Sequence, residues 1–278
     1  MDAESDPIRE NVVCALRTSR NDDNRFHRHS SVYEIYLFLQ GRIDLYVEHS
    51  RYRLHRGDLL VLAPAEMHRA ATLDDTLYER LTVNIRSALV TRLSTTHTDL
   101  SSCFLNRPEG EGNAVSLTDA QMAEFLELFW KIHHNIGRAD YGSDIVAEAA
   151  LLNLLLLVNQ SFRSPASQPD DIMPSTVTDV MLYIDEHLAE PITLENLSSI
   201  FCRNGRAISR EFKKHTGITL REYLLHKRID RACSLLRQRK SVTEVCYGSG
   251  FGNYSNFIRT FTREIGVPPG RYARSPAG

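Results

Sequence analysis

The sequence predicts two domains of different class, an all-β barrel with a helical appendage followed by an all-α domain. At 278 residues the chain is longer than one hydrophobic core usually needs. Short β-branched runs with glycine and proline between them fill residues 11–87, whereas apolar residues recur at helical spacing after residue 117. The predicted segments are a barrel over 1–114, helices over 115–162, a polar, proline-containing linker over 163–174 and the all-α domain over 175–278.

The charge is divided unevenly between the two predicted domains. Residues 175–278 hold 16 Lys and Arg against 10 Asp and Glu, a balance of +6. Residues 1–174 hold 17 against 25, a balance of −8, which restores the total of −2. A basic module joined to an acidic one indicates that the second domain binds a polyanion and the first binds something else.

Several features indicate a cytoplasmic protein without a membrane segment. The five cysteines include no Cys-x-x-Cys pair and no zinc spacing, which is typical of reduced thiols in the cytosol. The acidic first residues argue against a signal peptide. The most apolar stretch, residues 147–158, contains Asn153 and is too short to span a bilayer, so we expect a buried helix there.

In the first domain, four strands are expected over 32–39, 43–48, 52–54 and 59–63. Residues 32–39 are β-branched and aromatic, and residues 43–48 alternate apolar and polar side chains as a half-buried strand does. Turns at Gly41 and Gly57 and a stop at Pro64 separate these short segments. Closely spaced strands of this kind favour a small barrel or sandwich.

The helical segment contains two predicted helices. Ser116 or Thr118 can cap the first, which carries apolar residues at helical spacing from Met122 to Trp130. Ser143 opens the second, which is apolar on nearly every side through Leu157. Such a helix must be covered by the barrel, by a partner helix or by a second subunit, so core packing and homodimerisation both remain open.

The all-α domain contains the same helix-turn-helix pattern twice, over 192–217 and 241–266. In the first copy Leu194, Leu197, Ile200 and Phe201 are expected on one inner face. Asn204 and Asn253 can cap the second helix of each copy, and an apolar pair four residues apart turns that helix inward. The outward residues are then Arg206, Ser209, Arg210, Lys213 and Lys214 in the first copy, and Tyr254, Ser255, Ile258 and Arg259 in the second.

These outward residues suit double-stranded DNA. Arginine can donate two hydrogen bonds to guanine in the major groove, and lysines near a helix end suit phosphates. Residues 219–236 between the copies are expected to form one helix with its inner stripe at Leu225, Ile229, Ala232 and Leu236. If this helix sets the two reading helices about 34 Å apart, one subunit reads two successive major-groove faces.

Residues 176–273 resemble the DNA-binding domain of the AraC/XylS family of bacterial transcription regulators. The resemblance rests on an ordered run from Phe212 through Leu236 and a second from Gly250 through Tyr272. The resemblance implies a cytoplasmic regulator that binds promoter DNA and acts as a homodimer. RNA polymerase is expected as a further partner. Ser198 and Cys246 depart from the alanine that is usual in the family, and Ile258 replaces a commonly polar residue.

The first domain resembles the cupin barrels in a set of histidines and a glutamate. Metal-binding cupins use two histidines and a glutamate from one motif and a histidine from a second, which here correspond to His27, His29, Glu34 and His68. Strand alternation sends His27 and His29 to one face, and imidazoles with a carboxylate suit Zn, Fe, Ni or Mn. Glu66 stands where glycine is usual, which leaves the position of His68 open.

Two functions from different classes compete for the first domain. In one, a cupin-like sensor binds a small molecule, such as a sugar or related metabolite, and alters promoter binding. Its effector pocket would hold His27, His29, Glu34, Tyr36 and His68, with Tyr33 and Tyr46 as further aromatic candidates. In the other, a metal-dependent cupin enzyme is fused to a regulator. The sequence offers no further base or nucleophile, so we expect a sensor and no enzyme, with a divalent metal as a possible cofactor.

Overall fold

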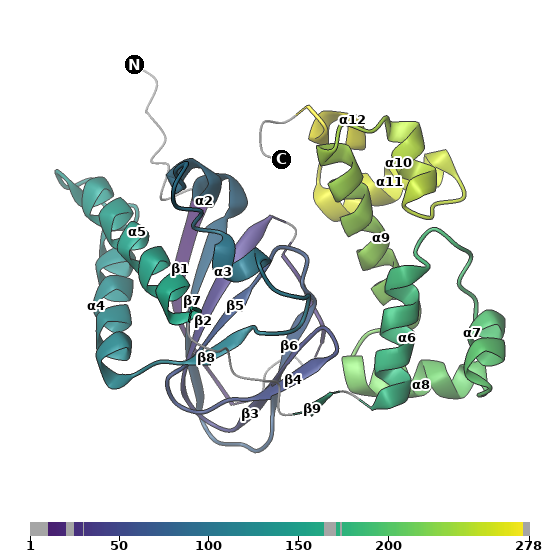
Figure 1. Ribbon diagram of the computed structural model, residues 1–278, viewed down its shortest axis with the longest axis horizontal. Helices are drawn as coiled ribbons and strands as arrows, with labels where there is room; N and C mark the ends of the chain where they lie inside the picture. The colour runs from purple at the N-terminus through teal and green to yellow at the C-terminus, as the bar shows by residue number, and fades with distance from the viewer. Residues whose placement is uncertain (1–10, 21–24, 30, 164–170, 173, 275–278) are drawn as a thin grey trace. The chain divides into compact units, whose positions relative to one another are not determined.

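A computed structural model describes residues 11–20, 25–29, 31–163, 171–172 and 174–274 (Figure 1). These residues form two compact units, one built mainly from His27–Asp171 and the other from Ile172 onward. The first unit is rich in strands and the second is all helical, which confirms the predicted fold class. Most of the predicted linker, and the acidic start of the chain, lie outside the described residues.

The strands of the first unit form two antiparallel sheets. The five-stranded sheet has the order β1 (Val12–Ser19), β7 (Tyr78–Arg86), β2 (Val32–Gln40), β5 (Asp58–Leu62) and β8 (Ala114–Ser116). The four-stranded sheet has the order β6 (His68–Thr72), β3 (Ile43–Val47), β4 (Ser50–Arg53) and β9 (Asp171–Ile172). The four strands expected from the sequence are all present, whereas β1, β6 and β7 were not individually predicted.

Alternation along β2 divides its side chains between two cores. Tyr36 and Phe38 pack between the two sheets, whereas Ile35 and Leu37 face the helices on the outer side of the five-stranded sheet. Tyr33 belongs to the outer set and packs on Phe104, with the ring centroids 4.5 Å apart. The interpretation of Tyr33 as a pocket residue is therefore wrong, because an odd-numbered position on this strand faces away from Glu34.

Four helices complete the outer core: α2 (Ser87–Leu93), α3 (Ser102–Leu105), α4 (Asp119–Asn135) and α5 (Ser143–Ser161). Thr118 caps α4 through a capping box with Gln121, as the sequence indicated. Figure 1 shows α4 and α5 side by side, and both contribute to the core of the five-stranded sheet. The helical segment is thus the second layer of the same core and not a separate body.

The apolar helix α5 is partly covered by this core. Its length and composition would allow it to cross a membrane, but its inner face, including Leu151, Leu154 and Leu155, is fully buried within the unit. Its other side exposes Ile145, Val146 and Leu156. Core packing therefore explains one face of α5 and leaves the other unexplained.

The second unit contains seven helices in the part of the chain that the structure describes. They are α6 (Ser175–Glu186), α7 (Leu194–Phe201), α8 (Gly205–Thr216), α9 (Leu220–Arg237), α10 (Val242–Gly248), α11 (Tyr254–Ile265) and α12 (Pro269–Tyr272). The inner stripe expected on α9 is present, because Ile229, Ala232 and Leu236 are buried and Leu225 packs against them. The expected inner face of α7 is only partly correct. Leu197 is buried, but Ile200 is 46% exposed.

Candidate nucleic-acid interface and histidine site

The helices α8 and α11 share one frame. Each has 12 residues, begins after an asparagine whose side chain accepts backbone N–H groups, and ends at a glycine in the left-handed region. The caps are Asn204 and Gly217 for α8, and Asn253 and Gly266 for α11. Fully buried aromatic side chains at Phe212, Phe257 and Phe261 fix the inner faces, so the opposite faces of both helices are turned outward.

The outward residues of α8 are predominantly cationic. Arg206, Arg210, Lys213 and Lys214 are exposed, whereas Ser209 is half-buried. The one acidic residue of this helix, Glu211, forms an ion pair with Arg203 of the preceding turn at 2.9 Å. The four outward cations are therefore not neutralised by that carboxylate, and they form a surface suited to phosphates and guanine edges.

The outward residues of α11 are of a different chemical kind. Tyr254, Ser255 and Arg259 are exposed, and the Arg259 guanidinium donates to Asn256 Oδ1 at 3.1 Å. Ile258, expected to face a base, is half-buried and packs against the core of the second helix-turn-helix. Asn256 was not selected from the sequence, although its place one turn before Arg259 is a signal for an i, i+3 contact.

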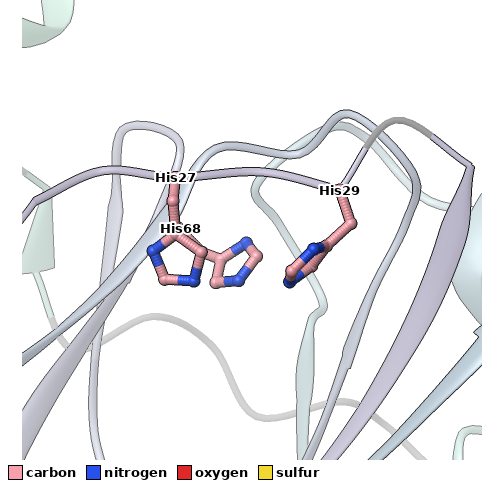
Figure 2. A group of neighbouring side chains, drawn as sticks. All are labelled: His27, His29 and His68. Atoms are coloured by element: carbon pink, nitrogen blue, oxygen red, sulfur yellow. The ribbon is translucent and has the colours of Figure 1, made fainter. Parts of the chain in front are cut away.

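In the first unit, backbone pairing brings three histidines together (Figure 2). The backbone N–H groups of His27 and His68 each donate to the other's carbonyl at 2.9 Å, and Ala65 donates to the His29 carbonyl at 2.9 Å. Residues 27–29 thus run like a strand beside residues 65–68, so His27 and His29 point the same way. Their nearest ring nitrogens and that of His68 lie within 4.8 Å of one another.

Glu34 of β2 adds a carboxylate to these histidines. Its Oε2 atom lies 3.3 Å from Nε2 of His29 and 3.5 Å from Nε2 of His68. Burial alone would raise the pKa of Glu34, but the neighbouring imidazoles hold it well below the usual value, so the group is an anion at neutral pH. The structure thus brings together all four residues of the predicted metal set, here named the histidine cluster: His27, His29, Glu34 and His68.

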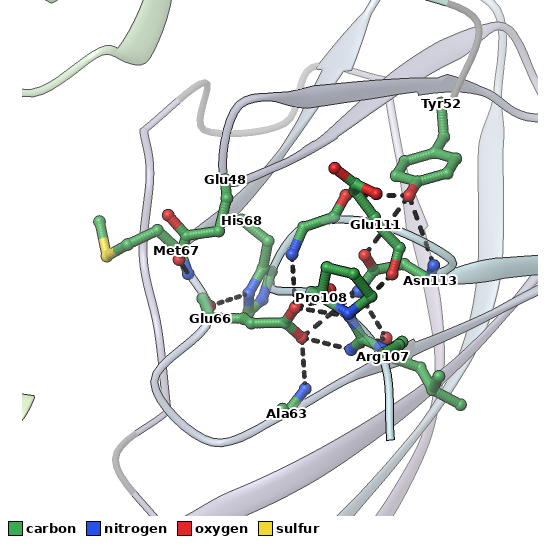
Figure 3. Close-up of polar contacts among 12 residues, drawn as sticks. Glu48, Tyr52, Ala63, Glu66, Met67, His68, Arg107, Pro108, Glu111 and Asn113 are labelled. Carbon is green, nitrogen blue, oxygen red and sulfur yellow. Dashed lines mark hydrogen bonds and ion pairs between the residues drawn. The ribbon is translucent and has the colours of Figure 1, made fainter. Parts of the chain in front are cut away.

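Glu66 holds His68 in a defined orientation (Figure 3). The Glu66 carbonyl oxygen lies 3.0 Å from Nδ1 of His68, and its side chain forms a buried ion pair with Arg107 at 2.6 Å. The same carboxylate accepts from the backbone of Ala63 at 2.7 Å and of Gly110 at 3.0 Å. Glu66, which stands where glycine is usual, therefore holds the site in place and does not disrupt it. Sequence reasoning missed this role because Arg107 lies 41 residues away.

Tyr36 does not line an open pocket beside the histidines. It is buried between the sheets, and its hydroxyl is paired with that of Tyr78. Burial and this neighbour raise its pKa well above the usual value, so it is a neutral phenol. Tyr46 is half-buried, with the Arg69 guanidinium stacked 4.1 Å from its ring centroid.

A hollow of about 430 Å³ lies at the opposite end of β2 from Glu34. Its lining includes Phe38, Gly41, Arg42, Arg53 and Arg56. Arg42 is paired with Asp74 at 3.1 Å and Arg53 with Asp44 at 2.9 Å. These paired arginines are separate from the histidine cluster.

Relatives named as transcription factors match part of this chain. A "HTH-type transcriptional activator RhaS" from Enterobacter sp. is 31% identical over 44% of this chain and 43% of its own length. The protein of the same name from Salmonella arizonae is 32% identical over 48% of each chain. The chain thus spans less than half the length of these relatives. The crystal structure of ToxT from Vibrio cholerae covers 95% of this chain and 97% of its own, at 15% identity and a TM-score of 0.37.

Two family models cover most of the sequence. A model of the AraC-like ligand-binding domain matches residues 11–155, and a model of a helix-turn-helix domain matches residues 197–275. The first match alone covers more than half of the 278 residues. The match contains the histidine cluster, and the second contains both outward helices. The chain belongs to the AraC family of helix-turn-helix transcription regulators.

Proposed function

We propose that this protein is a sequence-specific DNA-binding regulator of transcription in which α8 and α11 enter the major groove. The repeated frame of these helices carries the proposal, because an asparagine cap, buried aromatic residues and a glycine stop recur at both. From the first helix-turn-helix, Arg206, Ser209 and Arg210 meet bases, and Lys213 and Lys214 meet phosphates. Tyr254, Ser255 and Arg259 meet the second half-site, with a smaller role for the half-buried Ile258.

The connecting helix α9 supports a two-part binding site on DNA. Its 18 residues extend about 27 Å, which is comparable to the pitch of about 34 Å that separates successive major-groove faces. Its buried stripe belongs to the core that also holds Phe257 and Phe261. One subunit then contacts two half-sites on the same side of the duplex.

The first unit serves as the sensor in this proposal. It holds a buried anionic carboxylate beside three imidazoles, an arrangement that a ligand can engage with a defined geometry. Relatives are named transcriptional activators, which favours a sensor over a fused cupin enzyme. Activation in the cytoplasm through contact with RNA polymerase follows from the same proposal.

We also propose that the protein forms a homodimer through the uncovered side of α5. Ile145, Leu152 and Leu156 follow one another at spacings of seven and four, so they share one face of the helix. Ile145 is 68% exposed and Leu156 is 37% exposed. The double variant Ile145→Lys with Leu156→Lys is expected to change the mass measured by light scattering from dimer to monomer. Lys131→Glu on the exposed side of α4 is the control.

Selection of duplexes from a random library by the purified protein tests DNA reading directly. The expected result is an enriched motif in two parts, with centres about one helical turn apart. Enrichment of a single short motif would contradict reading by both helices, and no enrichment at all would reject the proposed function.

A further inference from the structure

The hollow of about 430 Å³ at the end of β2, here named the arginine hollow, has an apolar floor and a cationic rim. The floor consists of three buried apolar side chains, those of Phe38, Ile43 and Leu54. The rim carries three exposed arginines, Arg42, Arg53 and Arg56. Among the described residues that line the hollow, none is acidic, so its surface combines apolar area with positive charge.

Backbone hydrogen bonds fix the walls of the arginine hollow. The Gly57 N–H group donates to the Phe38 carbonyl at 3.1 Å, and the Leu54 N–H group donates to the Ile43 carbonyl at 3.3 Å. The described lining residues all belong to the β-rich unit. The fold of this unit therefore sets the shape of the hollow before a ligand arrives, which lowers the entropic cost of binding.

Arg56 brings a charge without a counter-ion to the rim. Its Nη1 atom donates to the carbonyl of Leu39, another lining residue, at 3.3 Å. Arg56 forms no ion pair with a described residue. A guanidinium group has five N–H donors and stays charged at neutral pH, so one bond to a carbonyl leaves most of its donors for a ligand.

The other two arginines are held by carboxylates that do not neutralise the rim. Arg53 donates from Nε and Nη2 to the two oxygens of Asp44, at 2.9 Å and 3.2 Å. Asp44 is buried and also accepts from Arg51 at 3.5 Å, so two arginines share its charge. Arg42 is paired with Asp74 at 3.1 Å, but its side chain is 69% exposed, where an ion pair contributes little. Positive charge at the rim therefore exceeds negative charge.

We propose that the arginine hollow binds a small organic carboxylate, with the apolar body of the ligand on the floor and its carboxylate against the guanidinium groups. The planar fork of arginine matches the two oxygens of a carboxylate, and burial of the apolar body adds to the affinity. The volume lies within the range of about 300–1,000 Å³ that is usual for small-molecule sites. A neutral sugar would leave the charge of the rim unused. The site goes beyond the proposed function, because it is separate from the histidine cluster and does not depend on DNA reading.

The test uses the full-length protein, titrated calorimetrically with phenylacetate and with hexanoate. We expect each acid to bind once per chain with a dissociation constant of about 1 mM or lower. Phenylacetamide has the same body without the charge, and inorganic phosphate has charge without an apolar body. Both should bind at least about tenfold more weakly than phenylacetate.

Two rim variants locate the site. Arg56→Gln should weaken phenylacetate binding by about tenfold, and Arg42→Gln by about threefold, because Asp74 already shares the Arg42 guanidinium. Arg138→Gln is the matched control and should not change the affinity. Arg138 is an arginine of the same unit that is paired on the surface with Asp140 at 3.2 Å and lies outside the lining. Circular dichroism establishes that each variant is folded.

The possible results decide between distinct statements. Absence of binding by both acids at up to about 10 mM would overturn the site. Equal affinity for phenylacetate and phenylacetamide would overturn recognition of the carboxylate, and equal affinity for phosphate would overturn the role of the apolar floor. Unchanged affinity in both folded rim variants, or the same loss in Arg138→Gln, would overturn the location. None of these measurements uses DNA, so failure of the site leaves the proposed function untouched.

Discussion

The two helix-turn-helix units have the same frame but present different chemistry to DNA. Between its caps, α8 carries four cationic residues and one acidic residue, whereas α11 carries Arg259 and Arg263 against Glu264. The first helix-turn-helix therefore offers charge, and the second offers an aromatic ring, a hydroxyl and the Arg259 guanidinium at the middle of α11. We therefore expect electrostatic affinity for DNA to come mainly from the first helix-turn-helix and discrimination among bases mainly from the second.

The turns of both helix-turn-helix units are tightly packed, but against different segments: a Cβ atom at Gly205 would lie 2.4 Å from the carbonyl oxygen of Leu194 in the same helix-turn-helix. A Cβ atom at Gly250 would lie 2.0 Å from the Leu188 carbonyl oxygen, and its φ of +84° lies in the left-handed region. Arg228 donates to the same oxygen at 3.0 Å and to the Glu190 carbonyl at 2.7 Å. The turn between α10 and α11 is thus packed closely against the segment that follows α6.

The largest expected effect is that of Gly250→Ala. Steric overlap with Leu188 together with a left-handed backbone should lower the free energy of unfolding of this region by about 3 kcal/mol. Hydrogen exchange of the full-length protein should then speed up in α10 and α11 more than in α7 and α8. Gly252→Ala is the matched control, because a Cβ atom there would meet nothing within 4 Å. Equal exchange in the two variants would contradict the close packing of this turn.

Arg210→Ala and Arg259→Ala should each weaken binding to the selected duplex by about 1–3 kcal/mol without unfolding the protein. Each should relax base preference in its own half-site only, since each guanidinium meets one half-site. Fluorescence anisotropy with duplexes mutated in one half-site measures this. Arg138→Ala, in the β-rich unit, serves as a charge-matched control. Loss of preference in both half-sites from either variant would break the assignment of one helix to one half-site.

The double variant Lys213→Ala with Lys214→Ala should change the salt dependence of binding more than its sequence preference. Loss of two phosphate contacts should reduce the slope of log affinity against log salt by about 2. Arg263→Ala in the last turn of α11 provides the comparison from the second helix-turn-helix. It is expected to change the slope by about 1 or less. A change of the same size from Arg263→Ala, which removes one charge and not two, would contradict the main electrostatic role of the first helix-turn-helix.

The smallest expected effects come from the caps of the first helix of each unit. Ser241 caps α10 in a reciprocal capping box with Glu244, whereas Thr193 caps α7 by accepting from Asn196 alone. Ser241→Ala should cost about 1 kcal/mol and Thr193→Ala somewhat less, which thermal denaturation of the full-length protein can measure. A larger loss of stability from Thr193→Ala than from Ser241→Ala would indicate that the first helix-turn-helix limits the stability of the helical domain.

Much of the helical domain could be predicted because its signals are local. Asn204, Asn253, Gly217 and Gly266 mark the ends of the two outward helices within a few residues of where they act. Ile200 and Ile258 were misplaced because helical spacing gives a face but not the neighbour that covers it. Ile200 has too little covering it, whereas Ile258 is drawn onto the core of its own unit.

The β-rich unit was less accessible to prediction because its partners are distant in sequence. The predicted pocket grouped Glu34 with Tyr36, which lie on the same side of β2, but it also included Tyr33, which packs on the other side. The strand β7 separates β1 from β2 in the sheet although it follows both in the chain. Local patterns do not encode such an order, since it depends on which strands pair after the chain has turned back.

The sequence by itself determined the double helix-turn-helix, its outward arginines and the resemblance that grouped three histidines with a glutamate. These features follow from spacing, capping and composition, which act over a few residues. Only the tertiary structure decided that His27 pairs with His68 and that Glu66 is held by Arg107. It also placed the Glu34 carboxylate beside the His29 and His68 imidazoles, because long-range strand pairing and burial set the positions of atoms that no local pattern relates.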